Sequence, residues 1–339
     1  MILVDGSSLL HRVLSTDQAE LKDSSGRYTG GLHGFLISLG SVATKYRLKH
    51  QIIVAWDLGI PLFRREIYRE YKPHKFPIGD VANELKSAQN LLEREGEEAP
   101  NEWLEKYVMS RHLLHKKFLP MTGCLSIHVQ NCEADDIIAY VCEKVLDEEI
   151  IILSTDRDLI QLLNKDRSFY DGRTQTTIMI DDIIKEHKLE GDWRQHWMLA
   201  RAMAGDGSDG IPGVGPGFSH CIEYARQVLR SGEPLGQALI KLEKVPRGRS
   251  AGFEAMRTAE ETIKRNLKLI DLRYPIMFNL PIVKDIQTQI ASCQFKNIDP
   301  DLVELELHDL QMVKAKPYAN SIIESNLNFE SIDYIKRMT

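Results

Sequence analysis

The sequence predicts an α/β protein in which a largely parallel sheet is flanked by helices and followed by a helical region. Three observations lead to this prediction. Short apolar runs alternate with helical stretches in the first half of the 339-residue chain, the pattern of a parallel sheet with helices on both faces. Four of these runs end at or just before acidic residues. From about residue 182 onward, the spacing of apolar residues is helical.

The predicted strands are short, and helices or turns follow them. The first strand leads into a helical stretch that carries Leu9, Leu10 and Val13. Residues 32–46 return to helical spacing after a polar loop, and acidic residues within 133–136 open another helix. Two β-rich runs flank the polar turn DGRTQ and predict a β-hairpin. The strand-like runs are residues 2–4, 51–56, 125–129, 150–153, 168–170 and 176–180.

The remaining segments are predicted to be helical. Residues 192–204 form one expected helix, a glycine-rich connection spans 205–217, and another helix begins near Phe218. Residues 78–110 are strongly charged with few core candidates, which indicates an insertion that stands off the core. We therefore expect an α/β domain and a helical domain, at residues 1–181 (with the insertion at about 64–112) and 182–339.

Composition and charge narrow the function classes. No run approaches the ~20 apolar residues of a membrane span, and the start MILVDGSSLL lacks the features of a signal peptide. Five scattered cysteines without a CxxC pair favour reduced thiols in a cytoplasm over a zinc site or disulfides. The net charge of −6 opposes nucleic-acid binding, but it becomes +3 if nine carboxylates of one proposed metal site are set aside.

Acidic residues follow the predicted strands and recur on the glycine-rich connection. In sheets of this kind, ligands bind beyond the carboxyl ends of the strands. These acids are therefore expected to converge in space although they are far apart in the sequence. The nine candidates are Asp5, Asp57, Glu133, Asp135, Asp136, Asp156, Asp158, Asp206 and Asp209.

A cluster of carboxylates suits the hydrolysis of phosphodiesters. That reaction needs an activated water and neutralised charge, which two hard cations about 4 Å apart supply. Mg²⁺ prefers oxygen ligands, so carboxylates would hold it rather than His or Cys. Each acid alone has an ordinary explanation, because Asp5 and Asp57 suit turns or caps and the acids at 133–136 suit a helix dipole. Their recurrence at one sheet edge favours the metal site.

Six motifs carry a family resemblance: VDGSSLL, VAWD, FRREIYREYK, CEADDIIAY, STDRDLIQLL and GDGSDGIPGVGPG. In this order and spacing they resemble the flap endonuclease and 5′–3′ exonuclease family, which includes the 5′-nuclease domain of DNA polymerase I. The resemblance covers roughly residues 1–275, and IKRNLKLIDL is most similar to bacteriophage members such as the T-even phage ribonuclease H. It implies a PIN-like fold in which the insertion is a helical arch and residues 205–217 belong to a helix-three-turn-helix.

The resemblance also implies an activity. The family's members are structure-specific 5′ nucleases that cut near junctions of single- and double-stranded DNA with two Mg²⁺ or Mn²⁺ ions. Asp5, Asp57, Glu133, Asp135 and Asp136 would hold the first metal, and the other four acids would surround the second. Expected substrates are 5′ flaps, nicks, gaps or RNA–DNA hybrids in replication and repair. We expect a monomer in a bacterial cytoplasm or phage-infected cell, with partners such as a single-stranded DNA-binding protein.

Basic and DNA-contacting residues are assigned in the same way. Arg64 and Lys72 match the family's catalytic basic pair, which would draw the scissile phosphate to the metals. Tyr71 either stacks on a nucleobase or packs in the core. Lys75 would contact DNA, and glycine backbones of the connection would approach phosphate or a bound K⁺. These glycines are Gly213, Gly215 and Gly217.

The chain departs from the family pattern in its connection and its insertion. Gly210 stands where the family has Asn, the connection is one residue shorter, and Ser219 lies near the usual Lys. The insertion is unusually acidic. A non-catalytic DNA-junction binder and a PIN-type ribonuclease are the alternative functions, and cleavage with and without Mg²⁺ distinguishes them. Residues 300–339 are expected to form either helical packing or a partner-binding tail.

Overall fold

A six-stranded sheet lies at the centre of the computed structural model, which describes residues 1–46, 51–73, 102–146, 148–244, 250–293, 298–327 and 338. The strand order is β3-β2-β1-β4-β5-β6. The first five strands are parallel, and β6 pairs antiparallel with β5 as the expected hairpin. The predicted fold class is confirmed. The strands are β1 (Ile2–Asp5), β2 (Ile52–Trp56), β3 (Leu125–His128), β4 (Ile150–Ser154), β5 (Arg167–Asp171) and β6 (Thr176–Ile178).

Helices cover both faces of the sheet, which is why its central strands are apolar on both sides. On one face, α7 (Ala134–Lys144) packs on β1 and β2, and α15 (Pro281–Ser292) packs on α7 and β3. On the other, α1 (Gly6–Leu14) and α2 (Gly30–Tyr46) cover the strands. Successive residues of β1 alternate between the two cores, with Leu3 on the α7 side and Val4 on the α2 side.

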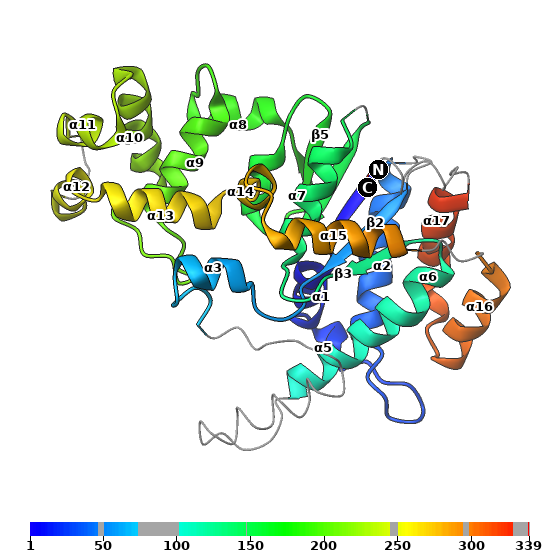
Figure 1. Ribbon diagram of the computed structural model, residues 1–339. Helices are drawn as coiled ribbons and strands as arrows, with labels where there is room; N and C mark the ends of the chain where they lie inside the picture. The colour runs from blue at the N-terminus through cyan, green and yellow to red at the C-terminus, as the bar shows by residue number, and fades with distance from the viewer. Residues whose placement is uncertain are drawn as a thin grey trace, which may run out of the picture.

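A helical region extends from one side of the sheet (Figure 1). Its central helix, α9 (Trp193–Ala204), packs against α10 (Phe218–Ser231) and α13 (Glu260–Ile270). Asp192 caps the start of α9, and Gly205 ends it with a φ of 72°. The expected helices at 192–204 and near Phe218 are therefore present. The others are α8 (Ile180–His187), α11 (Leu235–Ile240), α12 (Ser250–Arg257) and α14 (Tyr274–Met277).

The expected insertion is partly corrected. Residues 74–101 lie outside the described residues, and with them lie Lys75 and most of the acidic segment. However, α5 (Glu102–Leu113) does not stand off the core, because it packs on α1 and α2 and buries Leu104, Tyr107 and Val108. Before the gap, α3 (Leu62–Ile67) packs against α13, and after α5 come η2 (Leu114–Phe118) and α6 (Leu119–Met121).

The described C-terminal helices return to the α/β part of the molecule. After α16 (Pro300–Asp309), α17 (Lys316–Leu327) packs along α2. Asn326 accepts a hydrogen bond from the Ile52 backbone N–H (3.1 Å) and donates to the Thr122 carbonyl (3.0 Å). Residues 300–327 therefore follow the packing alternative. The domain boundary at 181/182 stays a prediction. Residues beyond this boundary complete the hydrophobic core on the α2 side of the sheet.

Two short 3₁₀ helices, η1 (Asp17–Glu20) and η4 (Val313–Ala315), connect these elements, and a third, η3 (Arg157–Leu162), follows β4. The cysteines are all free, as expected from their spacing. Among the helices described, none combines the length and apolar character needed to cross a membrane.

Candidate active site

A cavity of about 580 Å³ opens at the carboxyl ends of β1, β2 and β4. Seven of the nine predicted carboxylates line it, and they come from five separate segments of the chain. The two that do not line it are Asp136 and Asp209. The topology therefore brings most of the predicted acids together. The seven are Asp5, Asp57, Glu133, Asp135, Asp156, Asp158 and Asp206.

Asp5 and Asp57 lie where two adjacent parallel strands end. Asp5 is the last residue of β1 and caps α1, since its Oδ1 accepts the Ser8 backbone N–H at 2.9 Å. Its other oxygen accepts the Ser154 hydroxyl at 2.8 Å. Asp57 follows β2 and accepts the Ala134 N–H at 2.8 Å, which ties the end of β2 to the start of α7. Both residues are thus structural and line the cavity.

The start of α7 supplies three acids that point in different directions. Glu133 is the N-cap and is 2% exposed, although its carboxylate reaches the cavity. Asp135 lines the cavity and has no hydrogen-bond donor among the described residues. Asp136 turns away, and both its oxygens accept from Arg64, at 2.7 and 2.8 Å. The expected triad therefore divides into two cavity residues and one buried ion-pair partner.

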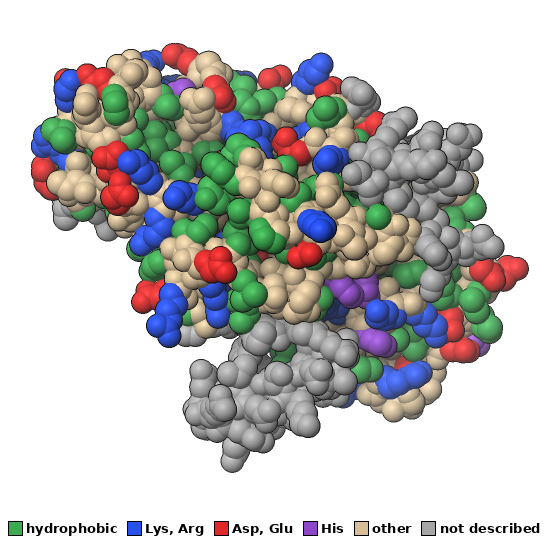
Figure 2. Space-filling view, viewed as in Figure 1, with side chains coloured by type: hydrophobic (Ala, Val, Ile, Leu, Met, Phe, Trp, Pro, Cys, Tyr) green, Lys and Arg blue, Asp and Glu red, His purple; other side chains and the backbone are tan. Residues whose placement is uncertain are grey.

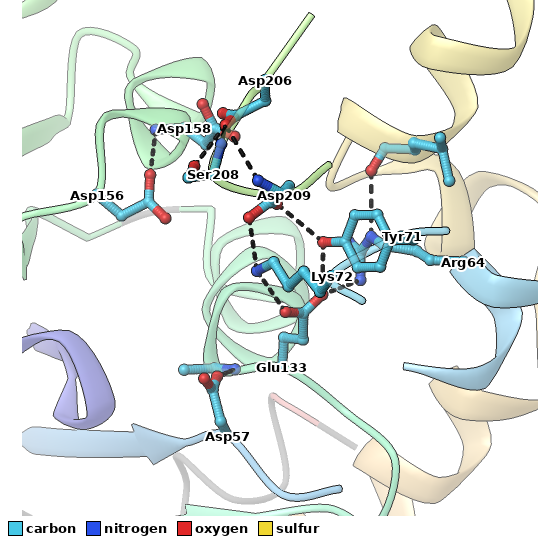
Figure 3. A network of polar contacts seen from close by, with 12 residues as sticks. Asp57, Arg64, Tyr71, Lys72, Glu133, Asp156, Asp158, Asp206, Ser208 and Asp209 are labelled. Atoms are coloured by element: carbon cyan, nitrogen blue, oxygen red, sulfur yellow. Dashed lines mark hydrogen bonds and ion pairs between the residues drawn. The ribbon is translucent and has the colours of Figure 1, made fainter. Parts of the chain in front are cut away.

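The remaining acids come from the turn after β4 and from the glycine-rich connection. Asp156 caps η3 by accepting the Asp158 N–H at 2.8 Å. Asp206 accepts the backbone N–H of Ser208 at 2.8 Å, and its own backbone pairs with Ile211. Asp209 does not line the cavity, and its carboxylate contacts Lys72 and the Tyr71 hydroxyl. Figure 3 shows this network.

Burial and neighbouring negative charges make three of these carboxylates harder to ionise. Burial, with the charge of Asp57 second, raises the pKa of Asp5 to about 7. Burial, followed by the charges of Asp156 and Asp5, raises the pKa of Asp135 well above its usual range. Burial raises the pKa of Asp158 to about 7 although the Arg201 guanidinium opposes this. Bound cations would relieve this repulsion.

Two basic side chains lie between the acids. Lys72 Nζ is 2.7 Å from Glu133 Oε1 and 3.1 Å from Asp209 Oδ1. Arg201 bridges Asp158 and Asp206 in the same way. As the described side chains stand, no three His, Cys, Asp or Glu residues are grouped closely enough to hold a metal ion. In this arrangement, the protein's own cations offset part of the negative charge.

Lys72 adopts a backbone conformation that side-chain-bearing residues seldom take. Its φ is 45°, and its backbone N–H donates to the Asp209 carbonyl at 2.8 Å. Its carbonyl accepts from Arg65 at 2.9 Å. Burial, the largest single effect, lowers the pKa of Lys72, but the charges of Glu133 and its other acidic neighbours together hold the pKa well above the usual range. The surrounding contacts therefore hold the charged form of this amine at the cavity.

Arg64 occupies a different position from the one expected of a phosphate-binding residue. It is 1% exposed and does not line the cavity. Its guanidinium pairs with Asp136 and Glu133, and its Nε donates to the Leu269 carbonyl at 3.1 Å. Because these contacts use all three of its nitrogens, Arg64 joins α3, α7 and the end of α13.

Tyr71 and the glycines are also placed by the structure. Tyr71 is 3% exposed, and its hydroxyl contacts Glu133 at 2.9 Å and Asp209 at 3.0 Å, which favours the packing alternative. A Cβ on Gly213 would lie 1.9 Å from the Ala204 carbonyl oxygen, and one on Gly215 would lie 2.3 Å from Cys221 Sγ. Gly217 has a φ of 115°. Internal packing thus already requires glycine at Gly213 and Gly215.

Sequence reasoning missed several cavity residues. Arg201 stands alone in the apolar stretch MLARAMAG at the end of α9, and this isolation was the available signal. The Ser7 and Ser154 hydroxyls hold the Asp57 backbone and the Asp5 carboxylate, at 2.9 and 2.8 Å. The remaining cavity side chains are polar or basic and include His11, Arg12, Arg157 and Arg173.

Divalent cations fit this donor set. The acids that line the cavity offer oxygen ligands, which Mg²⁺ and Mn²⁺ accept. Asp135 has no protein donor to satisfy its carboxylate among the described residues, and the pKa values of three acids are raised. Lys72 and Arg201 show that positive charge already stabilises both ends of the cluster.

Comparison with known proteins agrees with the fold and identifies the family. Residues 1–190, more than half of the chain, match the family model of the 5′–3′ exonuclease N-terminal resolvase-like domain. A 5′–3′ exonuclease of Buchnera aphidicola (from Acyrthosiphon pisum) is 26% identical over 217 residues, which are 63% of this chain and 65% of that protein. A 5′–3′ exonuclease of Aquifex aeolicus is 24% identical, with 92% of each chain covered.

A solved structure shares the fold. The flap endonuclease of bacteriophage T5, solved in a complex with DNA and metal ions, aligns with a TM-score of 0.58 and 22% identity. The alignment covers 95% of this chain and 98% of the phage protein. The first matched relatives are covered over 65% of their own length. The family model, the order of the motifs and the shared fold agree, and the chain belongs to the 5′–3′ exonuclease family.

Proposed function

We propose that this protein is a metal-dependent 5′–3′ exonuclease and flap endonuclease that hydrolyses phosphodiester bonds of DNA near single-strand/duplex junctions. One observation carries the proposal. Seven carboxylates from five segments meet in one cavity at the carboxyl edge of a 5′–3′ exonuclease family fold. Of two further cavities among the described residues, one is lined by three acids and the other by none. Such a cluster suits metal-assisted phosphodiester hydrolysis.

We propose two Mg²⁺ ions as the cofactors, with Mn²⁺ able to replace them. When bound, such ions activate a water and neutralise charge on the attacking and leaving oxygens. Asp5, Asp57, Glu133 and Asp135 would hold the first ion. The other cavity acids would surround the second. These are Asp156, Asp158 and Asp206, whereas Asp136 and Asp209 would hold Arg64 and Lys72 in place.

Lys72 is the proposed phosphate-binding cation of the cavity. It lines the cavity and keeps its charge, whereas Arg64 is enclosed by its partners. A fixed cation beside the metal ligands would draw a phosphate toward them and stabilise charge that develops during cleavage. The left-handed backbone of Lys72, tied to the loop that carries Asp209, supports a functional placement.

Duplex DNA would be held beside the cavity by contacts to its phosphate backbone. Figure 2 shows Lys and Arg side chains over α3 and α13, mixed with acidic ones. Arg265 of α13 lies over the Tyr68 ring at 4.3 Å, which joins these two elements. With the loop at 205–217, they would grip phosphates without reading sequence. The loop is also the proposed K⁺ site, where Gly217 brings the backbone to the surface.

The proposed setting is DNA replication and repair. The substrates would be 5′ flaps, nicks, gaps or RNA–DNA hybrids, and the partners would include a single-stranded DNA-binding protein. Five free thiols suit the reducing cytoplasm of a bacterium or a phage-infected cell. A monomer is sufficient for the proposed reaction because every acid that lines the cavity comes from one chain.

Cleavage of a DNA duplex with a 5′ flap, labelled at the flap end, tests the proposal. The protein should release a short labelled fragment in Mg²⁺ or Mn²⁺ and none in EDTA. An RNA flap and an unstructured RNA strand serve as parallel substrates. Intact DNA with retained binding would identify a junction-binding protein instead, and preferential cutting of the RNA strand would identify a ribonuclease.

A further inference from the structure

Arg201 is one of the cavity side chains for which the family resemblance supplies no role. It lies near the end of α9, four residues before Gly205, and it lines the cavity beside the Asp158 and Asp206 carboxylates. Its side chain is 20% exposed. An arginine on a packed helix is positioned more rigidly than one on a loop, so its guanidinium is directed into the cavity by the fold itself.

The hydrogen bonds of Arg201 leave part of its guanidinium unused. A single nitrogen, Nη2, donates to both carboxylates, to Asp206 Oδ2 at 2.7 Å and to Asp158 Oδ1. Within the described part of the chain, Nε and Nη1 of Arg201 have no acceptor. Arginine carries five N–H donors in a fixed fork. Donors on two further nitrogens are therefore available to an anionic group in the cavity.

Arg64 differs from Arg201 because its guanidinium has no nitrogen without a hydrogen-bond acceptor. All three of its nitrogens donate to Asp136, Glu133 or the Leu269 carbonyl, and it is 1% exposed. It has no free edge to present to a substrate. Arg201 has both the free edge and the cavity position. Of these two guanidiniums, the one that can meet a phosphate is therefore the one on α9.

We infer that Arg201 contacts a phosphate of the DNA substrate on the Asp158–Asp206 side of the cavity, while Lys72 serves the Glu133 side. This inference rests on the proposed function. A guanidinium matches two phosphate oxygens at once, and the match strengthens the contact beyond that of a point charge. Arg201 would keep Asp158 and Asp206 in place through Nη2 and bind the phosphate through Nε and Nη1.

The test combines variants of Arg201 with neutral phosphates in the DNA. Equilibrium binding of a 5′-flap duplex is measured in EDTA for the wild type, Arg201→Ala and Arg201→Lys. Each is also measured with one methylphosphonate at the cleaved phosphate or at either neighbour. Arg201→Ala should weaken binding of normal DNA about tenfold. For one of the three DNAs that carry a methylphosphonate, Arg201→Ala and the wild type should bind equally well. Arg201→Lys should show a smaller loss at the same position.

The rate of cleavage in Mg²⁺ is the second quantity measured. Arg201→Ala should lower kcat about 100-fold or more, because a phosphate contact that strengthens in the transition state is lost. Arg194→Lys is the matched control, since Arg194 lies on the same helix but outside this cavity, and it should cleave and bind like the wild type. Thermal unfolding in EDTA shows whether each variant is folded. If Arg201→Ala does not fold, Arg201→Lys takes its place in the test.

Two results would overturn the inference. One is an equal loss of binding for Arg201→Ala with the normal DNA and with every methylphosphonate DNA. Arg201 would then only hold the Asp158 and Asp206 carboxylates in place. The other is unchanged binding and cleavage. A wild-type protein that binds flap DNA but never cuts it would instead refute the proposed function. The coupling between Arg201 and a single phosphate would still be measurable in that case, so the two failures are distinguishable.

Discussion

Several acids of the cavity perform a structural task and a proposed chemical task with the same carboxylate. Asp5 caps α1, Glu133 caps α7 and Asp156 caps η3, and each also lines the cavity. The ordinary explanation of such residues as caps and the metal-site explanation are therefore compatible. Asp135 differs because it lines the cavity without capping anything, which makes it the cleanest residue for separating the two tasks.

Asp135→Asn should separate activity from stability. The pKa of Asp135 is raised by burial and by the charges of Asp156 and Asp5, so its ionised form is repelled in the folded protein. The variant should lose cleavage by about 10³-fold or more, because a proposed metal ligand is lost. In EDTA at pH 8 it should melt at a higher temperature than the wild type, by about 2–4 °C for each kcal/mol of repulsion relieved.

Flap cleavage and thermal unfolding measure the two effects of Asp135→Asn. Asp285→Asn on α15 is the control outside the cavity, and it should leave both properties unchanged. Near-normal turnover would remove Asp135 from the metal site. A lower melting temperature would contradict the repulsion inferred here.

Lys72→Ala should affect cleavage more than binding. The amine keeps its charge beside Glu133, where it would stabilise the reacting phosphate. We expect kcat to fall by about 100-fold or more, with the Kd for flap DNA in EDTA changed less than about tenfold. Filter binding and single-turnover kinetics measure the two quantities. The reverse pattern, a large loss of binding with normal cleavage, would show that Lys72 only grips DNA.

Arg64→Ala should act on stability. Removing the guanidinium leaves the buried Asp136 carboxylate without its ion-pair partner, whereas Glu133 keeps Lys72. Breaking a buried ion pair of this kind costs about 3–5 kcal/mol. Urea unfolding should show that loss, and Arg65→Ala, which removes a partly buried neighbour on the same helix, should cost less. An Arg64→Ala protein as stable as the wild type but inactive would restore the expected phosphate role.

At the scale of elements, the sequence predicts strands and helices better than side-chain directions. The apolar runs at 2–4, 51–56, 125–129 and 150–153 differ from the strands by at most a residue or so at each end. The direction of Arg64 could not be predicted, because α3 is placed by its packing on α13, some 200 residues later in the chain. Arg201 was missed for a similar reason, since its cavity exists only after folding.

Gly213→Ala should disturb the connection at 205–217. An added Cβ would lie 1.9 Å from the Ala204 carbonyl oxygen, so backbone must shift. Overpacking of this kind costs about 1–3 kcal/mol, and a moved connection should also weaken duplex binding. Gly207→Ala is the matched control in the same segment, because its Cβ would meet nothing within 4 Å. Chemical unfolding and duplex binding of the two variants check this, and equal behaviour would contradict it.

For the whole molecule, segments far apart in sequence complete one structure around the cavity. The fold class, the hairpin and the convergence of most acids follow from strand ends in a parallel sheet. The packing of α15 on the α7 side of the sheet was not predicted, and the packing of α17 on the α2 side was predicted only as one of two alternatives, helical packing or a tail. That choice depends on complementary surfaces such as those of α2 and α17, which a single sequence does not display.

The central claim is that the carboxylate cavity cuts DNA at a 5′ junction with divalent metal. Single-turnover cleavage of a 5′-labelled flap duplex over a range of Mg²⁺ concentrations tests it most directly. The account predicts that the rate rises with Mg²⁺ until the sites are filled, that the cut lies next to the junction, and that EDTA stops it. Flap DNA that stays bound and intact at every Mg²⁺ and Mn²⁺ concentration would contradict the account.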